Sequence, residues 1–179
     1  MSTRTSRAPS VRLLRDPGHF LSLGGGAGLI PFAPGTWGSV VGVLLAWGLQ
    51  ELPAAWFWGL LMLMGAIGVP LCGRTGNILG QVDHGAIVWD EVVGVMVAIG
   101  LAAGTGLPPG SGSGGVTPLT LLAAFVLFRI LDITKPWPIG LLERRLGGGW
   151  GVMADDLAAG AVAGLVLMQL NPGRFFGSP

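Results

Sequence analysis

Charged residues are scarce in this 179-residue sequence: Asp, Glu, Lys and Arg make up 11% of it, whereas apolar residues make up 51%. A soluble domain needs a far larger polar surface, so this scarcity argues against a soluble protein with one buried core. Asp, Glu, Lys and Arg are missing altogether from four segments: 17–50, 52–73, 92–128 and 157–173. Because about 17 to 25 apolar residues suffice to cross a bilayer as a helix, the sequence predicts a membrane protein.

Cysteine and histidine are also scarce. Cys72 is the single cysteine, so no disulfide can form within the chain, and we expect Cys72 to be a small packing residue. The two histidines, His19 and His84, do not provide the Cys/His grouping that zinc prefers. The net charge of +1 gives no indication of a nucleic-acid partner.

The few basic residues are unevenly placed. Residues 1–18 carry Arg4, Arg7, Arg12 and Arg15, which predicts a disordered basic arm at the anionic cytoplasmic surface of the membrane. We expect residues 19–174 to form one membrane domain. Within it, the glycine-rich segment 104–116 is expected to be a loop on the non-cytoplasmic side.

The hydropathy pattern predicts an all-α fold: a polytopic membrane bundle of about five main helices, with short re-entrant or interfacial segments. The expected helices cover 36–50, 53–72, 86–103, 117–133 and 154–170. Lys and Arg follow the second and fourth of them and are absent after the first and third. The positive-inside rule therefore places the amino terminus in the cytoplasm. Gly160 and Gly164 form a G-x-x-x-G pattern, which favours helix packing over a dedicated dimer face.

Six of the nine acidic residues fall in three short clusters at the predicted cytoplasmic face: Asp83, Asp90 and Glu91; Asp132; and Asp155 with Asp156. Asp90 and Glu91 are expected about five residues, or ~7 Å, inside the third helix. Asp132 is expected to end the fourth helix, and Asp155 and Asp156 to begin the fifth. Carboxylates beside hydrocarbon are costly and are usually kept for function, and their oxygens suit a hard cation such as magnesium. The alternative for Asp155 and Asp156 is helix capping.

Basic and hydroxyl side chains near these clusters could bind phosphate. Arg129 and Lys135 could hold phosphate oxygens; the alternative is that Arg129 only pairs with Asp132 and neutralises a helix end. His84 could donate a proton to a leaving group or be an ordinary loop histidine. Thr36 and Ser39 could offer groups to an anion, or Thr36 could simply be an N-cap.

Four motifs together resemble the phosphatidylglycerophosphatase A family. They are P-x-A-P-G-T-x-G-S at 31–39, D-H-G-x-I-V-W-D-E at 83–91, F-R-I-L-D-x-x-K-P-W-P-I at 128–139, and G-G-x-G-V-M-x-D-D-x-x-A-G at 148–160. The resemblance implies a Mg²⁺-dependent enzyme of the bacterial cytoplasmic membrane that removes the terminal phosphate from phosphatidylglycerophosphate. It also implies a helical bundle in which a central helix carries Asp90 and Glu91.

The hypothesis assigns each candidate residue a role. The expected catalytic residues are Asp83, His84, Asp90, Glu91, Asp132 and Asp156. The expected phosphate-binding residues are Arg129, Lys135, Thr36 and Ser39. The expected magnesium ligands are Asp90, Glu91, Asp155, Asp156 and Asp83.

Two other functions remain as alternatives. A phosphatidyl transferase would also use acids and magnesium at the inner leaflet, but its D-G-x-x-A-R pattern is absent. An ion or proton transporter would place acids near the bilayer midplane rather than at one interface. A homo-oligomer is compatible with the sequence.

Overall fold

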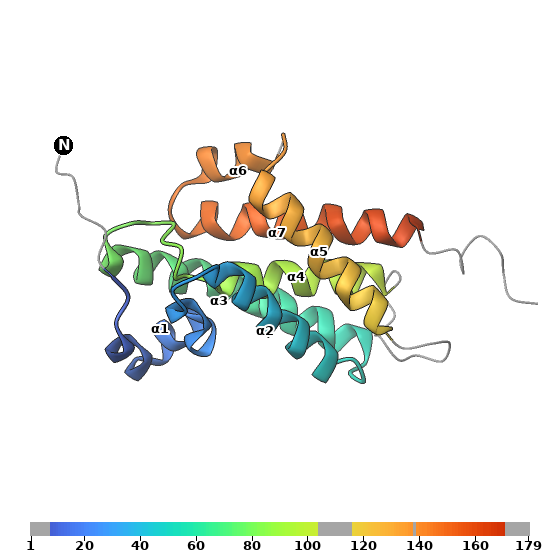
Figure 1. Cartoon of the computed structure of the whole chain (residues 1–179), viewed down its shortest axis with the longest axis horizontal. Coiled ribbons are helices and arrows are strands. Elements are labelled where there is room, and N and C mark those ends of the chain that lie inside the picture. Colours follow the sequence, from blue (N-terminus) through green and yellow to red (C-terminus); the bar gives the residue numbers. More distant parts are fainter. Residues whose placement is uncertain (1–7, 104–115, 138, 171–179) are drawn as a thin grey trace, which may run out of the picture.

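The computed structural model describes residues 8–103, 116–137 and 139–170, and every regular element in these ranges is helical (Figure 1). Two short 3-10 helices, η1 (Val11–Arg15) and η2 (Gly24–Leu29), flank α1 (Pro17–Ser22). The remaining helices are α2 (Pro34–Gly48), α3 (Ala54–Leu79), α4 (Trp89–Ala102), α5 (Pro118–Thr134), α6 (Ile139–Leu146) and α7 (Gly148–Leu170). The predicted all-α fold class is confirmed for the described part of the chain.

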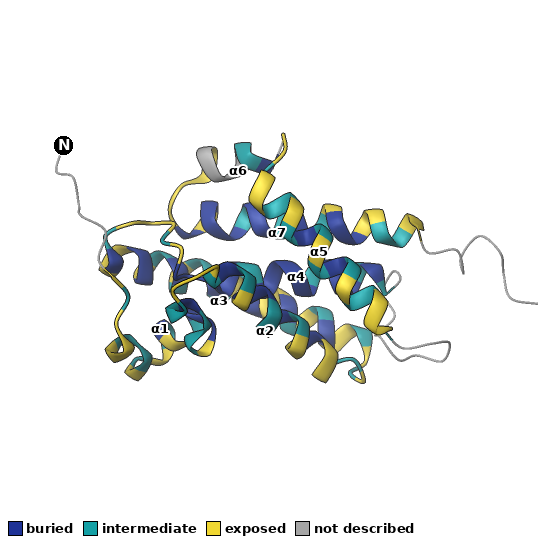
Figure 2. Ribbon diagram, in the orientation of Figure 1, coloured by how far each residue is buried: buried dark blue, intermediate teal, exposed yellow. Residues whose placement is uncertain are grey.

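Helix α4 lies at the centre of the structure. It contacts α2, α3, α5 and α7, and 11 of its 14 residues are buried, as the dark ribbon in Figure 2 shows. Val92, Val95 and Ile99 are completely shielded from solvent. A helix that is apolar on all sides is stable only when other helices surround it, which explains its central position.

Glycines bring α4 and α7 into direct backbone contact. A Cβ atom on Gly160 would lie 2.1 Å from the Gly94 carbonyl oxygen, and one on Gly164 would lie 2.8 Å from the Ala98 carbonyl oxygen. Any larger residue would push the two helices apart, because these distances are well below van der Waals contact. The interpretation of G-x-x-x-G as a packing motif is therefore confirmed, and the packing is within one chain.

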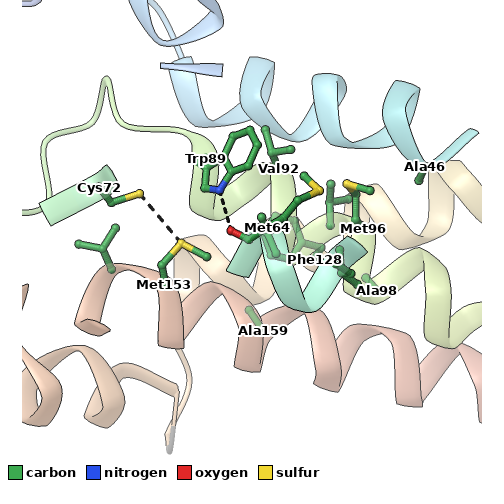
Figure 3. Close-up of a cluster of buried hydrophobic side chains, with 14 of the residues drawn as sticks. Ala46, Met64, Cys72, Trp89, Val92, Met96, Ala98, Phe128, Met153 and Ala159 are labelled. Atoms are coloured by element: carbon green, nitrogen blue, oxygen red, sulfur yellow. Dashed lines mark hydrogen bonds between the residues drawn. The ribbon is translucent and has the colours of Figure 1, made fainter. Parts of the chain in front are cut away.

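Buried sulfur and indole groups join α3 to its neighbours (Figure 3). The Cys72 Sγ lies 4.0 Å from the Met153 Sδ, and the Trp89 indole nitrogen donates a 3.0 Å hydrogen bond to the Met64 carbonyl. Cys72 is completely buried, so its predicted role as a packing residue is confirmed.

Among the described helices, two are long and apolar enough to cross a membrane: α3 with 26 residues and α7 with 23. Helices α2, α4 and α5 have 15, 14 and 17 residues. At 1.5 Å per residue they are roughly 21–26 Å long, which is less than the ~30 Å hydrocarbon core of a bilayer. Length therefore supports two of the five predicted spans.

Several helix boundaries differ from the predicted ones. Helix α3 continues from 72 to Leu79 and ends at Gly80, which has a left-handed φ of 81°. Helix α4 begins at Trp89 rather than 86, because residues 84–88 form a turn in which Ile87 N–H donates to the His84 carbonyl. Helix α7 begins at Gly148 rather than 154 and follows directly after α6. The hydropathy pattern did not predict α6.

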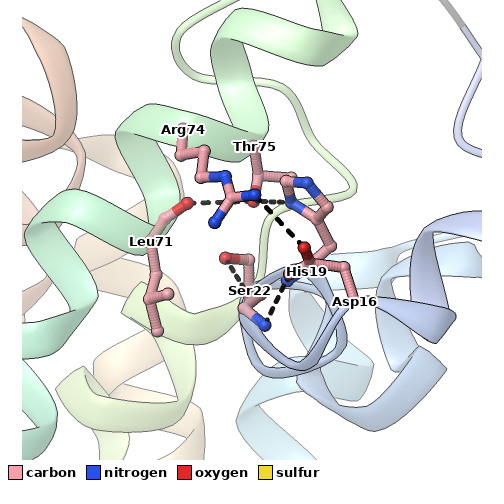
Figure 4. Close-up of polar contacts among 7 residues, drawn as sticks. Asp16, His19, Ser22, Leu71, Arg74 and Thr75 are labelled. Atoms are coloured by element: carbon pink, nitrogen blue, oxygen red, sulfur yellow. Dashed lines mark hydrogen bonds and ion pairs between the residues drawn. The ribbon is translucent and has the colours of Figure 1, made fainter.

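The prediction of a disordered arm over 1–18 is wrong for residues 11–18. The Asp16 carboxylate caps α1 by accepting hydrogen bonds from Gly18 N–H (2.8 Å) and His19 N–H (3.2 Å), and it pairs with Arg74 of α3. The bond from the His19 amide is the main cause that lowers the pKa of Asp16. His19 itself is buried, with its Nδ1 2.9 Å from the Thr75 Oγ1 (Figure 4). These contacts attach the segment to α3.

Residues 1–7, and residues 104–115 of the predicted glycine-rich loop, lie outside the described ranges.

The contact between α4 and α7 makes a first prediction. Gly160→Ala should destabilise the protein by about 1–3 kcal/mol, because the new methyl group would overlap the Gly94 carbonyl. Thermal unfolding of the purified protein in detergent, followed by circular dichroism, measures the effect. Gly59→Ala is the matched control, since Gly59 lies inside α3 and a methyl group there would meet no other atom within 4 Å. Equal unfolding temperatures for the two variants would contradict the tight helix contact.

Candidate functional site

Three carboxylates from two helices meet beside the contact between α4 and α7. Asp90 and Glu91 lie in the first turn of α4, Asp156 lies in α7, and one oxygen of each lies within 4.8 Å of the others. We call Asp90, Glu91 and Asp156 the acid cluster. Asp90 is only 6% exposed and Asp156 only 3%. The cluster is therefore nearly closed to solvent, where like charges repel strongly.

The two helices present these acids at different points along their length. Asp90 and Glu91 are the second and third residues of α4 rather than lying five residues inside it. Asp155 and Asp156 are the eighth and ninth residues of α7, about 10–12 Å from its first residue, rather than at its start. The capping alternative for Asp155 and Asp156 is therefore wrong, because the helix already begins at Gly148.

Several oxygens of the acid cluster have no hydrogen-bond donor in the described structure. Asp90 Oδ1, Glu91 Oε2 and Asp156 Oδ2 are fully buried and unpartnered. A buried carboxylate oxygen without a partner costs several kcal/mol, and such groups normally coordinate a cation or accept hydrogen bonds. Their oxygens are hard ligands of the kind that magnesium prefers.

Two basic side chains, one in α5 and one at its C-cap, contact carboxylates in this region. Arg129 forms an ion pair with Asp132, and its Nη1 lies 3.9 Å from the Glu91 Oε1. Lys135 has a left-handed φ of 40° at the end of α5, and its Nζ lies 2.5 Å from the Asp155 Oδ2. Arg129 thus does more than neutralise the helix end, because it also faces the acid cluster.

Among the described side chains of this region, the charges do not balance. Five carboxylates (Asp90, Glu91, Asp132, Asp155 and Asp156) lie near two basic groups, Arg129 and Lys135, which leaves three negative charges when all are ionised. A divalent cation would reduce this excess, and the basic groups could then exchange a carboxylate for phosphate oxygens.

Four other predicted residues, Asp83, His84, Ser39 and Thr36, are not members of the acid cluster. Asp83 is exposed in the loop before α4. The neighbouring His84 is half-buried, and its Nδ1 accepts a 3.1 Å hydrogen bond from Ala86 N–H. Ser39 is buried and donates its hydroxyl to the Gly35 carbonyl, 2.9 Å away. Thr36 is the third residue of α2 rather than its N-cap, which is Ala33.

Gly35 is a site residue that the sequence interpretation did not single out. A Cβ atom there would lie 2.2 Å from the Glu91 Oε1 and 3.2 Å from the Arg129 Nη1. The first turn of α2 therefore touches both the acid cluster and its basic border. In the sequence, the Pro34-Gly35 pair at the start of α2 was the available signal for this position. It could not show that Glu91 and Arg129 lie opposite Gly35.

Comparison with known proteins gives consistent results. The family model described as Phosphatidylglycerophosphatase A matches residues 20–171. A protein of Escherichia coli named phosphatidylglycerophosphatase A is 38% identical over 160 residues, covering 89% of this chain and 87% of that protein. A protein of the same name from Haemophilus influenzae is 40% identical over 162 residues, covering 88% and 91%. No solved structure matches the chain.

The repulsion within the acid cluster makes a second prediction. In the presence of a chelator, Asp156→Asn should stabilise the protein, by roughly 1–3 kcal/mol at an effective dielectric constant of about 20, because it removes one buried negative charge. Thermal unfolding with EDTA at pH 8 measures the change, and Glu51→Gln, at an exposed position, is the control. A lower unfolding temperature for Asp156→Asn would show that the carboxylate is already compensated.

Proposed function

This chain belongs to the phosphatidylglycerophosphatase A family, and we propose that it hydrolyses the terminal phosphomonoester of phosphatidylglycerophosphate, giving phosphatidylglycerol and phosphate. The observation that carries this conclusion is the extent of the match. The matched residues 20–171 contain the whole acid cluster and both of its basic neighbours. The enzyme is accordingly a phosphoric monoester hydrolase.

Magnesium is the proposed cofactor. The donor set supports it, because the acid cluster offers only carboxylate oxygens and includes buried ones without a partner. Asp90, Glu91 and Asp156 would hold the ion, and Asp155 and Asp83 are the further proposed ligands. When bound, Mg²⁺ would supply positive charge that offsets the negative charge of the phosphoryl group.

The basic residues are proposed to bind the phosphate. Arg129 can present two N–H groups to phosphate oxygens, whereas Lys135 acts as a compact charge. Asp132 pairs with Arg129 and so holds the guanidinium toward Glu91. Gly35 leaves room for this arrangement, and Thr36 and Ser39 on the same helix turn are proposed to assist phosphate binding.

The loop before α4 is proposed to supply a proton. Because the His84 Nδ1 accepts a hydrogen bond from Ala86, a neutral His84 carries its proton on Nε2, where it can be donated to the leaving glycerol oxygen. Asp83, the preceding residue, is proposed as a further catalytic group. The attacking group is water or a carboxylate of the acid cluster.

The proposed setting is the bacterial cytoplasmic membrane, with residues 19–174 as one multi-pass domain and the acid cluster toward the cytoplasm. The two long apolar helices support insertion. Arg74 near the end of α3 pairs with Asp16, and Arg12 and Arg15 lie in η1, which directly precedes Asp16 in the sequence. Positive charge of this kind is typical of the cytoplasmic side. The glycine-rich segment 104–116 is proposed to face the opposite side.

A direct assay tests the activity and its metal requirement. The purified protein should release phosphate from phosphatidylglycerophosphate with Mg²⁺ and lose this activity with EDTA. Asp90→Asn should lower kcat by at least about 100-fold, because it removes a buried oxygen ligand. Binding of Mg²⁺ by calorimetry gives a second readout, with Glu51→Gln as control.

Other outcomes would overturn this proposal. Full Mg²⁺-dependent activity in Asp90→Asn would exclude the assigned site. Release of CMP in place of phosphate would identify a phosphatidyl transferase. By contrast, phosphate release by the protein in detergent, where no gradient exists, would support the proposal and exclude the transporter alternative.

A further inference from the structure

One glycine of α3 is contacted by both helices that carry the acid cluster. Gly68 is buried near the middle of α3. A Cβ atom on Gly68 would lie 2.8 Å from Cδ1 of Trp89, in α4, and 2.7 Å from Sδ of Met153, in α7. We call Gly68, Trp89 and Met153 the three-helix contact. Because Gly68 has no side chain, α4 and α7 both pack closely on the same point of α3.

The three-helix contact lies beside the acid cluster on both helices. Trp89 is the first residue of α4 and directly precedes Asp90. Met153 lies three residues before Asp156 in α7, which places the two on neighbouring faces, about 4.5 Å apart along the helix axis. Each helix therefore touches α3 within one turn of a carboxylate of the acid cluster.

A buried hydrogen bond holds the first turn of α4 against α3. The Trp89 indole N–H donates to the Met64 carbonyl at 3.0 Å, and Trp89 is only 7% exposed (Figure 3). The N-cap residue, Val88, makes no side-chain capping bond, although its own N–H donates to the Ser22 carbonyl at 2.9 Å. The indole bond is thus the direct polar link between α3 and the turn that carries Asp90 and Glu91.

Ordinary core packing is the main alternative for a buried tryptophan. A second tryptophan provides the comparison. Trp58 of α3 packs on α4 near Gly100, where a Cβ atom would lie 3.0 Å from its ring. Gly100 is nine residues, or about 13 Å, beyond Glu91, so Trp58 stabilises the same pair of helices far from the acids. A role that Trp89 has and Trp58 lacks must concern the acid cluster.

We propose that the three-helix contact fixes the distance between the acids of α4 and Asp156, and thereby makes the site select Mg²⁺ over a larger cation such as Ca²⁺. This inference rests on the proposed magnesium site. Magnesium requires near-octahedral oxygens at about 2.0–2.1 Å, whereas calcium accepts irregular ones at about 2.3–2.6 Å. A shift of α4 in any direction therefore weakens Mg²⁺ binding more than Ca²⁺ binding. Gly68 and Trp89 are positioning residues in this account.

The test measures the dissociation constants of Mg²⁺ and Ca²⁺ by calorimetry on the purified protein in detergent. Trp89→Phe keeps an aromatic ring but removes the indole N–H. We expect its Kd for Mg²⁺ to rise about tenfold and its Kd for Ca²⁺ to rise less than about threefold. Gly68→Ala should act in the same direction, because the new methyl group would press on the Trp89 ring, whereas the flexible Met153 side chain can yield.

Matched controls separate positioning from packing. Trp58→Phe changes the tryptophan at the other end of α4. Gly65→Ala adds a methyl group to α3 where no other atom lies within 4 Å. Both controls should leave the two dissociation constants unchanged. Thermal unfolding followed by circular dichroism establishes that each variant is folded.

Failure of the inference is distinguishable from failure of the proposed site. If the wild-type protein bound Mg²⁺ but Trp89→Phe and Gly68→Ala bound it equally well, even with lower unfolding temperatures, the three-helix contact would be packing alone. An equal loss of affinity for both cations, or the same loss in Trp58→Phe, would also overturn the inference. If the wild-type protein bound neither cation, the proposed magnesium site would be wrong and the inference would fall with it.

Discussion

The central constraint on this structure is electrostatic: carboxylates from separate helices are held together where little solvent can screen them. Asp90, Glu91 and Asp156 gather on the interior side of α4 and α7, and Arg129 and Lys135 offset only part of their charge. Such an arrangement is unfavourable by itself and becomes favourable when further positive charge is present. The proposed chemistry uses this imbalance, since a phosphomonoester needs cations around it.

Close helix packing makes the arrangement geometrically possible. Gly94 and Gly160 allow α4 and α7 to touch through their backbones, and this contact sets Asp156 opposite Asp90 and Glu91. Gly35 does the same for α2, whose first turn reaches Glu91 and Arg129. The glycines thus determine how near the charged groups come to one another, although none of them carries charge.

Much of the fold was predictable from the sequence because hydropathy and charge are local signals. Five helices were found by their apolar runs, and α5 was predicted to within one residue at each end. The acids and bases of the site were identified because they interrupt those runs. The roles assigned to them stay predictions.

The remaining features depend on contacts that a linear pattern does not contain. The start of α4 is set by the turn over 84–88, and α7 begins early because α6 and a glycine turn lead directly into it. The order of residues 11–18 comes from Asp16 and His19 meeting α3 nearly sixty residues away. The role of Gly35 becomes visible only once Glu91 is seen opposite it.

In the proposed membrane setting, the burial of α4 has a physiological consequence: α2, α3, α5 and α7 insulate it from the surrounding lipid. Shifts in bilayer thickness or fluidity, such as those that accompany a change of growth temperature, would act on the outer helices first and leave α4, with the proposed site, comparatively undisturbed.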